Sequence, residues 1–187
     1  MDLKNKTVLF LGSSVTFGAT KKGVSFADIL AKKLSFNMIK SAVCGTTLAD
    51  INANSYPKRL MQIDKNTKVD LFVCQLSTND AGQNLPIIET EKAIRFIIEY
   101  TKSTFNCPLV FFTGTYFENE NYAKLVELII ALKEEYGFYL LDLYNDNKMR
   151  NISKKTYEKY MQDPIHPTIL GYEKWWSPKF IELFNLI

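Results

Sequence analysis

Apolar residues gather in five short runs that are spaced along the chain and separated by longer segments of mixed polarity. Several runs are apolar at nearly every position, which is typical of strands covered on both faces of a sheet. Their enrichment in β-branched and aromatic residues also favours strands. The five predicted strands are residues 7–11, 36–43, 69–76, 109–113 and 138–143.

The segments between these runs show the spacing of amphipathic helices. Ser25 followed by Asp28 predicts a capping box that opens one helix. Thr90 is predicted to cap a second helix, and a third helix is predicted to end at Gly137. The stripes of the three helices are Phe26, Leu30 and Leu34; Ala93, Ile94, Ile97, Ile98 and Thr101; and Leu125, Leu128, Ile129, Leu132 and Tyr136.

The alternation of strands and helices restricts the fold. Connections of this length between buried strands favour a parallel sheet with right-handed crossovers. We therefore expect an α/β fold, a three-layer α/β/α sandwich with a five-stranded, mostly parallel, flavodoxin-like sheet. Ligands of such sheets bind beyond the carboxyl ends of the strands. No repeat or linker interrupts the pattern, so residues 1–187 are expected to form a single domain.

The composition excludes several classes of partner. The chain has 187 residues, of which 47% are hydrophobic and 23% charged, a balance typical of globular domains. Its net charge of +3 is spread without a dense Lys/Arg block, so no nucleic-acid partner is expected. No apolar run approaches the roughly 20 residues of a membrane span, so no membrane partner is expected. The sequence does not define an oligomeric state.

The cysteines and the single histidine limit the compartment and the metal chemistry. Cys44, Cys74 and Cys107 are widely separated and odd in number, which fits reduced, buried thiols better than disulfides or a zinc cluster. The apolar run near the N-terminus is too short for a signal peptide, and a cytoplasmic location is expected. One histidine cannot form a metal site that needs several imidazoles, so no metal is expected.

Polar residues follow the first three predicted strands. Ser13 and Ser14 come after the first strand, Gly45 after the second and Asn79 after the third. The carboxyl ends of parallel strands meet at one edge of a sheet, so these residues are expected to face a common crevice. Each of them has an alternative role in a turn or a helix cap.

The segment after the first strand lacks two common loop motifs. Residues 12–18, GSSVTFG, have neither the Gly-x-Gly-x-x-Gly spacing nor the Lys-Ser/Thr ending of nucleotide-binding loops. Thr16 stands where a Gly-x-Ser-x-Gly nucleophile elbow has its second glycine. A nucleotide site and an ordinary α/β-hydrolase are therefore not expected.

The only histidine of the chain, His166, lies three residues after Asp163 in a segment flanked by prolines. The Asp-x-x-His spacing places a carboxylate within reach of the ring, where it can fix the tautomer and stabilise an imidazolium. A general base needs this support. The alternative is a surface histidine beside a capping aspartate.

These motifs together resemble the SGNH (GDSL-type) hydrolases, a family named for four blocks that carry Ser, Gly, Asn and His. Ser14, Gly45, Asn79 and His166 occur in that order. The resemblance runs from near residue 7 to about residue 172. Four blocks in order, with the only histidine in the last block, make chance agreement improbable.

Two positions depart from the usual pattern of this family. Ser13 stands where the family usually has Asp before the nucleophile, and Ser77 stands where it usually has Gly two residues before Asn79. The chain is therefore similar to a divergent branch in which the loop hydrogen bonds differ. Neither change removes a catalytic group.

The resemblance implies a serine ester hydrolase that works through an acyl-enzyme. Ser14 would attack the acyl carbonyl, His166 would accept the serine proton, and Asp163 would orient the ring. The backbone N–H groups of Ser14 and Gly45 and the side-chain amide of Asn79 would form the oxyanion hole. No metal or organic cofactor is implied.

The substrate is expected to be a small-molecule ester, an acetyl or short acyl ester of a sugar or similar alcohol. The interval between Asn79 and the helix near Thr90 is short for a lid, and the motif loops are rich in hydroxyls and amides. Tyr116 and Phe117 are candidate substrate-lining residues. A lysophospholipase or thioesterase is the alternative within the family, and a catalytically silent flavodoxin-like binding module is the alternative outside it. The hydroxyl and amide residues expected at the mouth are Ser13, Thr46, Thr47, Ser77, Thr78 and Asn145.

Overall fold

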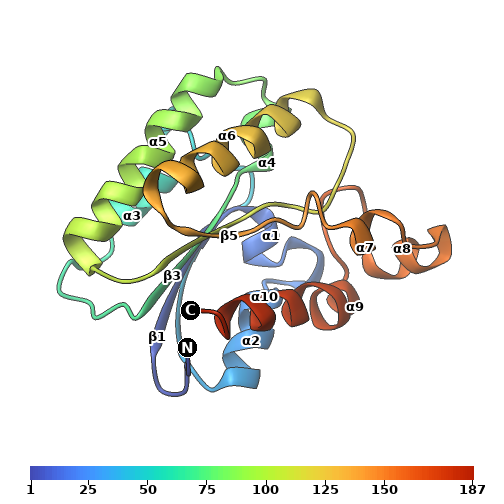
Figure 1. Ribbon diagram of the computed structural model, residues 1–187, viewed down its shortest axis with the longest axis horizontal. Coiled ribbons are helices and arrows are strands. Elements are labelled where there is room, and N and C mark those ends of the chain that lie inside the picture. The colour runs from blue at the N-terminus through green and yellow to red at the C-terminus, as the bar shows by residue number, and fades with distance from the viewer.

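A computed structural model describes residues 1–187 and contains one five-stranded sheet between two layers of helices (Figure 1). All neighbouring strands are parallel, and their order is β2-β1-β3-β4-β5. This is the flavodoxin-like order, and it confirms the predicted α/β sandwich. The strands are β1 (Thr7–Gly12), β2 (Asn37–Ala42), β3 (Leu71–Gln75), β4 (Leu109–Phe112) and β5 (Tyr139–Leu141).

Successive residues of the central strands contribute to opposite faces of the sheet. Leu9 and Leu11 of β1 belong to one hydrophobic cluster, whereas Val8 and Phe10 belong to the other, and all four are fully buried. Alternation on a strand buried on both faces produces the continuous apolar runs seen in the sequence. The sheet therefore has two cores, one under each layer of helices.

Different helices cover the two faces of the sheet (Figure 1). One face packs against α3 (Tyr56–Met61), α5 (Ile87–Tyr100) and α6 (Glu120–Tyr136). The other packs against α2 (Phe26–Leu34) and α10 (Ser177–Phe184), where the Phe26 and Phe180 rings stack with centroids 4.5 Å apart. No helix combines the length and the apolar character required to cross a membrane.

Short elements lie at the carboxyl edge of the sheet, where the candidate site was expected. They include α1 after β1, α4 after β3, and the helices that follow β5. Their bounds are α1 (Ser14–Phe17), a 3₁₀ helix (Ala19–Lys21), α4 (Thr78–Gly82), α7 (Asn147–Arg150), α8 (Lys154–Tyr160) and α9 (Ile169–Gly171). A π-helical turn at Tyr172–Trp176 follows α9, and another at Thr101–Phe105 leads from α5 into the amino end of β4.

Two predicted helix ends are confirmed and one is wrong. Ser25 and Asp28 form the predicted capping box of α2, and Gly137 ends α6 with a φ of 73°. Helix α5 begins at Ile87, directly after Pro86, so Thr90 lies inside the first turn and does not cap the helix. The Thr90 hydroxyl bonds a distant carboxylate instead, a contact that local sequence does not reveal.

The expectation that the cysteines are buried holds for Cys74 but is wrong for Cys44. Cys74 lies in β3 and is fully buried, whereas Cys44 is exposed. The reason is that Cys44 lies beyond the end of β2, in the turn that Gly45 makes with a φ of 75°. Val43 next to it is also 40% exposed.

Candidate active site

Ser14 lies directly beyond β1 as the first residue of α1, in a turn that is tightly packed. A Cβ on Gly12 would lie 2.0 Å from Thr16 Oγ1, so only glycine fits there. Gly18 ends the turn with a φ of 90°, a conformation that favours glycine. The Ser14 hydroxyl therefore sits on a fixed backbone at the expected edge of the sheet, and the residue is 9% exposed.

Asp163 and His166 interact within the loop between α8 and α9. The Asp163 oxygens Oδ2 and Oδ1 lie 2.8 Å and 3.0 Å from His166 Nδ1. A carboxylate can only accept a hydrogen bond, so Nδ1 carries the proton and Nε2 is left as an acceptor. Asp163 Oδ1 also accepts the backbone N–H groups of Ile165 and His166, each at 2.8 Å. One carboxylate thus fixes both the ring and its loop.

The environment of Asp163 keeps its carboxyl ionised. Partial burial disfavours the charged form, but the hydrogen bonds from the Ile165 and His166 backbone and from the His166 ring outweigh this effect. Together they hold the pKa of the Asp163 carboxyl below its usual value. A carboxylate is therefore present at neutral pH to stabilise a protonated ring.

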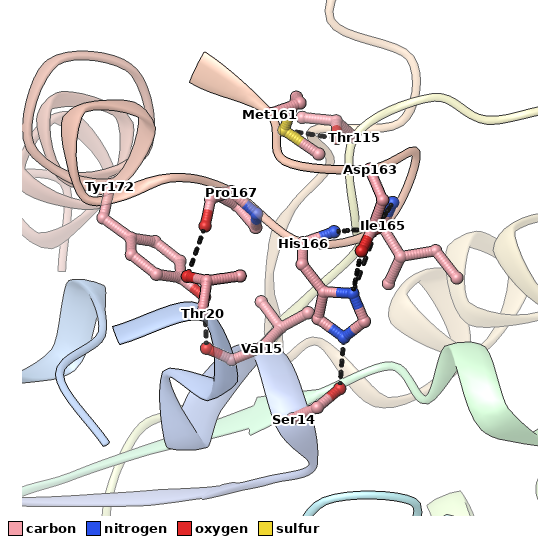
Figure 2. A network of polar contacts seen from close by, with 10 residues as sticks. All are labelled: Ser14, Val15, Thr20, Thr115, Met161, Asp163, Ile165, His166, Pro167 and Tyr172. Atoms are coloured by element: carbon pink, nitrogen blue, oxygen red, sulfur yellow. Dashed lines mark hydrogen bonds and ion pairs between the residues drawn. The ribbon is translucent and has the colours of Figure 1, made fainter. Parts of the chain in front are cut away.

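The His166 ring contacts the Ser14 hydroxyl. Ser14 Oγ lies 2.7 Å from His166 Nε2, although 152 positions separate the two residues in the chain. Figure 2 shows Asp163, the ring and Ser14 in one line. The structure therefore brings together the three side chains that the sequence nominated as nucleophile, base and orienting carboxylate.

Two long-range hydrogen bonds hold the histidine loop against the segment that contains Ser14 (Figure 2). Thr20 Oγ1 donates to the Pro167 carbonyl, and the Tyr172 hydroxyl donates to the Val15 carbonyl, both at 2.9 Å. Met161 and Pro167 close the loop with an isolated antiparallel bridge. The roles of Thr20 and Tyr172 were not predicted, because their partners are about as far away in the chain as Ser14 is from the histidine.

Gly45 and Asn79 lie side by side at the same edge of the sheet. An added Cβ on Gly45 would meet no atom within 4 Å, so the space beside this residue is open to a ligand. Asn79 Nδ2 donates to the carbonyl of Thr46 at 2.8 Å, which joins its amide to the Gly45 loop. An amide nitrogen carries two N–H groups, so one is left for a substrate oxygen. The N–H of Ser14, at the first position of α1, also lacks a partner within its helix.

Asp80 fixes the loop that follows Gly45, a role that was not predicted from the sequence. This residue is 1% exposed. Its Oδ2 accepts the Leu48 N–H at 2.8 Å, and its Oδ1 accepts the Ala49 N–H at 2.7 Å and the Thr90 hydroxyl at 2.9 Å. The only local signal was its position directly after Asn79.

Gln75 fixes the turn that carries Ser14, a role that was not predicted from the sequence either. Its Oε1 accepts the Ser13 N–H at 3.0 Å and the Thr16 hydroxyl at 2.7 Å, while its Nε2 donates to Ser13 Oγ at 3.2 Å. Ser13 stands where the resembled family usually has Asp. The neutral Gln75 amide therefore accepts a hydrogen bond from the Ser13 N–H and donates one to the Ser13 hydroxyl.

Tyr116 and Phe117 differ in their surroundings. Tyr116 is 39% exposed, stacks under the Arg150 guanidinium at 4.0 Å, and lines a cavity of about 300 Å³. Phe117 packs against the core with its ring centroid 4.9 Å from that of Tyr122. A role for these two residues in lining the substrate stays a prediction.

The expectation of a hydroxyl-rich mouth is wrong, because most of the side chains concerned are buried and bonded within the protein. Ser77 Oγ accepts the Asn79 N–H, and Thr46 Oγ1 donates to the Val43 carbonyl. Of the expected set, Asn145 is exposed. The other five, Ser13, Thr46, Thr47, Ser77 and Thr78, are at most 6% exposed.

Residues 10–174 match the family model of the GDSL-like lipase/acylhydrolase family. The chain belongs to this family. The matched range contains Ser14, Gly45, Asn79 and His166, the residues on which the resemblance rested. A search of curated proteins found no match. Membership of the GDSL-like family supports a hydrolase of the esterase or acylhydrolase type.

Solved structures of low sequence identity share this fold. A protein from Lactobacillus plantarum is 18% identical, with a TM-score of 0.84 and 98% of each chain covered. A member of the lipolytic G-D-S-L family from Veillonella parvula is 14% identical, with a TM-score of 0.75, covering 97% of this chain and 100% of the other. An acetylxylan esterase from Geobacillus stearothermophilus is 15% identical, with a TM-score of 0.75, covering 99% and 97%.

Proposed function

We propose that this GDSL-like hydrolase cleaves esters through a covalent acyl-enzyme on Ser14. The supporting observation is the chain of contacts from Asp163 Oδ2 to His166 Nδ1 at 2.8 Å and from Nε2 to Ser14 Oγ at 2.7 Å. A serine hydroxyl becomes a good nucleophile when an adjacent base takes its proton. In this proposal His166 is that base, and Asp163 is the group that orients it.

In the first half of the reaction, Ser14 Oγ attacks the acyl carbonyl carbon while its proton moves to His166 Nε2. Asp163 stabilises the resulting imidazolium. Collapse of the tetrahedral intermediate breaks the ester C–O bond, and His166 returns the proton to the leaving alcohol. In the second half, water attacks the acyl-enzyme with His166 again as base, releasing the acid and restoring Ser14.

The negative charge of the tetrahedral intermediate would be held by three donors. These are the backbone N–H groups of Ser14 and Gly45 and the free N–H of the Asn79 amide. Two observations support this assignment: the space beside Gly45 is open, and the Asn79 amide donates to the carbonyl of Thr46, the residue that follows Gly45. Preorganised donors of this kind stabilise the transition state without reorganisation during the reaction.

We propose acetyl or another short acyl group, on a sugar or similar alcohol, as the substrate class. Two observations support it: acetylxylan esterases occur among the similar structures, and only residues 83–86 connect α4 to α5 beside the site. A connection of this length cannot form a large lid. A long acyl chain gains about 0.8 kcal/mol per CH₂ only where water is excluded.

The exposed side chains of Ile87 and Ile88 favour the second candidate, a lysophospholipase or thioesterase. They are 42% and 49% exposed directly after that connection. A series of monomeric p-nitrophenyl esters decides between the two candidates. We expect kcat/KM to be highest for the acetate or butyrate, and a rise that continues past about eight carbons would contradict the short-acyl proposal.

Covalent labelling tests the central proposal. A fluorophosphonate probe should label the wild type once per chain, and Ser14→Ala should abolish both labelling and ester hydrolysis. The matched control is Ser13→Ala, which removes the neighbouring hydroxyl and should still be labelled. Loss of labelling in the Ser13 variant alone would show that the nucleophile is assigned to the wrong serine.

Absence of labelling and of hydrolysis in the folded wild type would favour the catalytically silent binding module. The expected cytoplasmic location and the single-domain organisation stay predictions, as does the expectation that no nucleic acid binds.

A further inference from the structure

Arg59 carries a guanidinium group that is buried behind the candidate oxyanion hole. It lies in α3 and is 5% exposed. Burial of a charged group is unfavourable unless its hydrogen-bonding groups are satisfied. A buried guanidinium at this position is therefore stable only if its N–H groups find hydrogen-bond partners.

All five N–H groups of the guanidinium donate to neutral oxygen atoms. Nε donates to the Asn54 carbonyl at 2.9 Å, and Nη1 donates to the carbonyl and the hydroxyl of Ser41, the latter at 3.0 Å. Nη2 donates to the Gly12 carbonyl at 2.8 Å and to Thr46 Oγ1 at 3.1 Å. The planar fork thus joins β1, β2 and the loop that follows β2.

The two contacts of Nη2 span the candidate oxyanion hole. Gly12 lies two positions before Ser14, and Thr46 directly follows Gly45. The carbonyl of Thr46 also accepts the Asn79 amide at 2.8 Å. Each of the three proposed donors is therefore at most two residues, or one hydrogen bond, away from a group that Arg59 holds.

We propose that Arg59 is a positioning residue that sets the spacing between the Ser14 N–H, the Gly45 N–H and the Asn79 amide. The proposal rests on the proposed ester hydrolysis. An oxyanion hole works only when its donors converge on the developing charge, within about 0.5 Å of the productive geometry. A buried fork that bonds both sides of the hole provides this constraint.

Lysine cannot replace arginine in this role. A lysine ammonium has three donors around one nitrogen, whereas the guanidinium presents five in a fixed plane. Lysine at position 59 would keep the charge but could not bond β2, Gly12 and Thr46 together. We therefore expect Arg59→Lys to resemble Arg59→Ala in catalysis more than it resembles the wild type.

The first experiment removes the Arg59 guanidinium by substitution and then supplies guanidinium from solution. In Arg59→Ala we expect kcat to fall about 10²-fold, comparable to the loss of one oxyanion donor. KM should change by less than about threefold, because the constraint acts in the transition state. Added guanidinium chloride should raise kcat at least about tenfold, whereas sodium chloride at the same ionic strength should not.

The control variant is Arg95→Ala, which removes an exposed guanidinium that pairs with Glu91 and Glu135 on the helices away from the site. It should keep the wild-type kcat and show no rescue by guanidinium. Because Arg59 does not contact the histidine loop, the pH dependence of kcat should keep its shape in Arg59→Ala. A folded Arg59→Ala protein with unchanged kcat would overturn the proposal.

A second pair of variants keeps the proposal testable if Arg59→Ala does not fold. Thr46→Val and Ser41→Ala each remove one hydroxyl that accepts from Arg59, on the loop side and on the β2 side respectively. We expect Thr46→Val to lower kcat and the rate of fluorophosphonate labelling, and Ser41→Ala to leave both within about twofold of the wild type. Equal effects of the two variants on kcat would overturn the positioning role.

Failure of this proposal can be distinguished from failure of the proposed function. If the wild type is labelled at Ser14 and hydrolyses esters while the Arg59 variants do so equally well, only the positioning role is wrong. If the folded wild type shows neither activity nor labelling, the serine-esterase function itself is wrong.

Discussion

The histidine side and the oxyanion side of the site are constructed in different ways. Asp163 and His166 interact across only three positions, and their side chains are 43% and 25% exposed. On the oxyanion side, Asp80 and Gln75 are 1% and 2% exposed, and their partners are 10 to 62 positions away. The contact between the proposed base and its carboxylate is thus local and partly exposed, although Thr20 and Tyr172 anchor the loop over long range. The groups that fix the proposed oxyanion donors make their long-range contacts in the core.

We expect this difference to separate residues whose substitution affects activity alone from residues whose substitution also affects stability. An exposed local hydrogen bond contributes little to global stability, while a buried donor left without a partner costs about 1–3 kcal/mol. Changes on the histidine side should therefore reduce activity in a stable protein. Changes on the oxyanion side should reduce both activity and stability.

The largest effect is expected for His166→Ala. This variant removes the only imidazole of the chain, so we expect kcat to fall by more than about 10⁴-fold, as for loss of a triad member. The melting temperature should move by less than about 2 °C, because the ring is partly exposed. Steady-state kinetics and calorimetry check both parts. Substantial ester hydrolysis in this variant would exclude the proposed mechanism.

Asn79→Ala should have the next largest effect on catalysis. Loss of one oxyanion donor lowers kcat by about 10² to 10³, and we expect a decrease in this range. The fluorophosphonate labelling rate should fall in parallel, because the phosphoryl oxygen uses the same donors. If kcat in the folded variant stays within a few-fold of the wild type, Asn79 does not belong to the oxyanion hole.

Replacing an aspartate with asparagine on the oxyanion side and on the histidine side sharpens the comparison. Asp80→Asn places an amide where the Leu48 and Ala49 N–H groups now donate, and we expect a loss of about 2 kcal/mol in the free energy of unfolding. That corresponds to a melting temperature lower by about 4–8 °C. Asp163→Asn should cost less than about 0.5 kcal/mol but lower kcat strongly. Equal losses of stability in the two variants would contradict the distinction between the histidine side and the oxyanion side.

The smallest effect concerns the dependence of stability on pH. Hydrogen bonds from Ile165 and His166 overcome partial burial and lower the pKa of the Asp163 carboxyl in the folded state. A lowered folded-state pKa gives stability that is present above the unfolded value of about 3.9 and is lost as the pH falls through the folded value. The difference in unfolding free energy between wild type and Asp163→Asn should therefore be small above about pH 5 and shrink further in acid. Urea titrations at several pH values measure it.

Local sequence patterns predicted most of the fold. The central strands β1, β3 and β4 are buried at nearly every position, and burial on both faces leaves a direct mark in the sequence. The edge strands β2 and β5 are partly exposed and were found from their β-branched and aromatic residues. The capping box at Ser25 and the stop at Gly137 were predictable because each is a contact within a few residues. The start of α5 was not, because the Thr90 hydroxyl bonds Asp80 instead of the helix end.

The candidate site shows the same contrast between residues found from local patterns and residues that make long-range contacts. Asp163 and His166 were recognisable from their spacing, and Ser14, Gly45 and Asn79 from their positions after strands and their resemblance to a family. The residues behind them were not recognisable, because their partners are adjacent only in the folded chain. The hydroxyl groups expected at the mouth were misjudged for the converse reason: the fold uses them internally. The list of missed residues is Arg59, Gln75, Asp80, Thr20 and Tyr172.

His166 lies in the loop closed by the bridge between Met161 and Pro167, in none of the five strands and in neither hydrophobic cluster. A lineage that replaces His166 would keep the sheet, both cores and the buried groups that shape the opposite wall. It would then possess a rigid pocket of N–H donors with no base beside it. Its N–H donors would still suit an anionic or carbonyl group of a ligand, so we expect binding to outlast catalysis when the histidine alone is replaced.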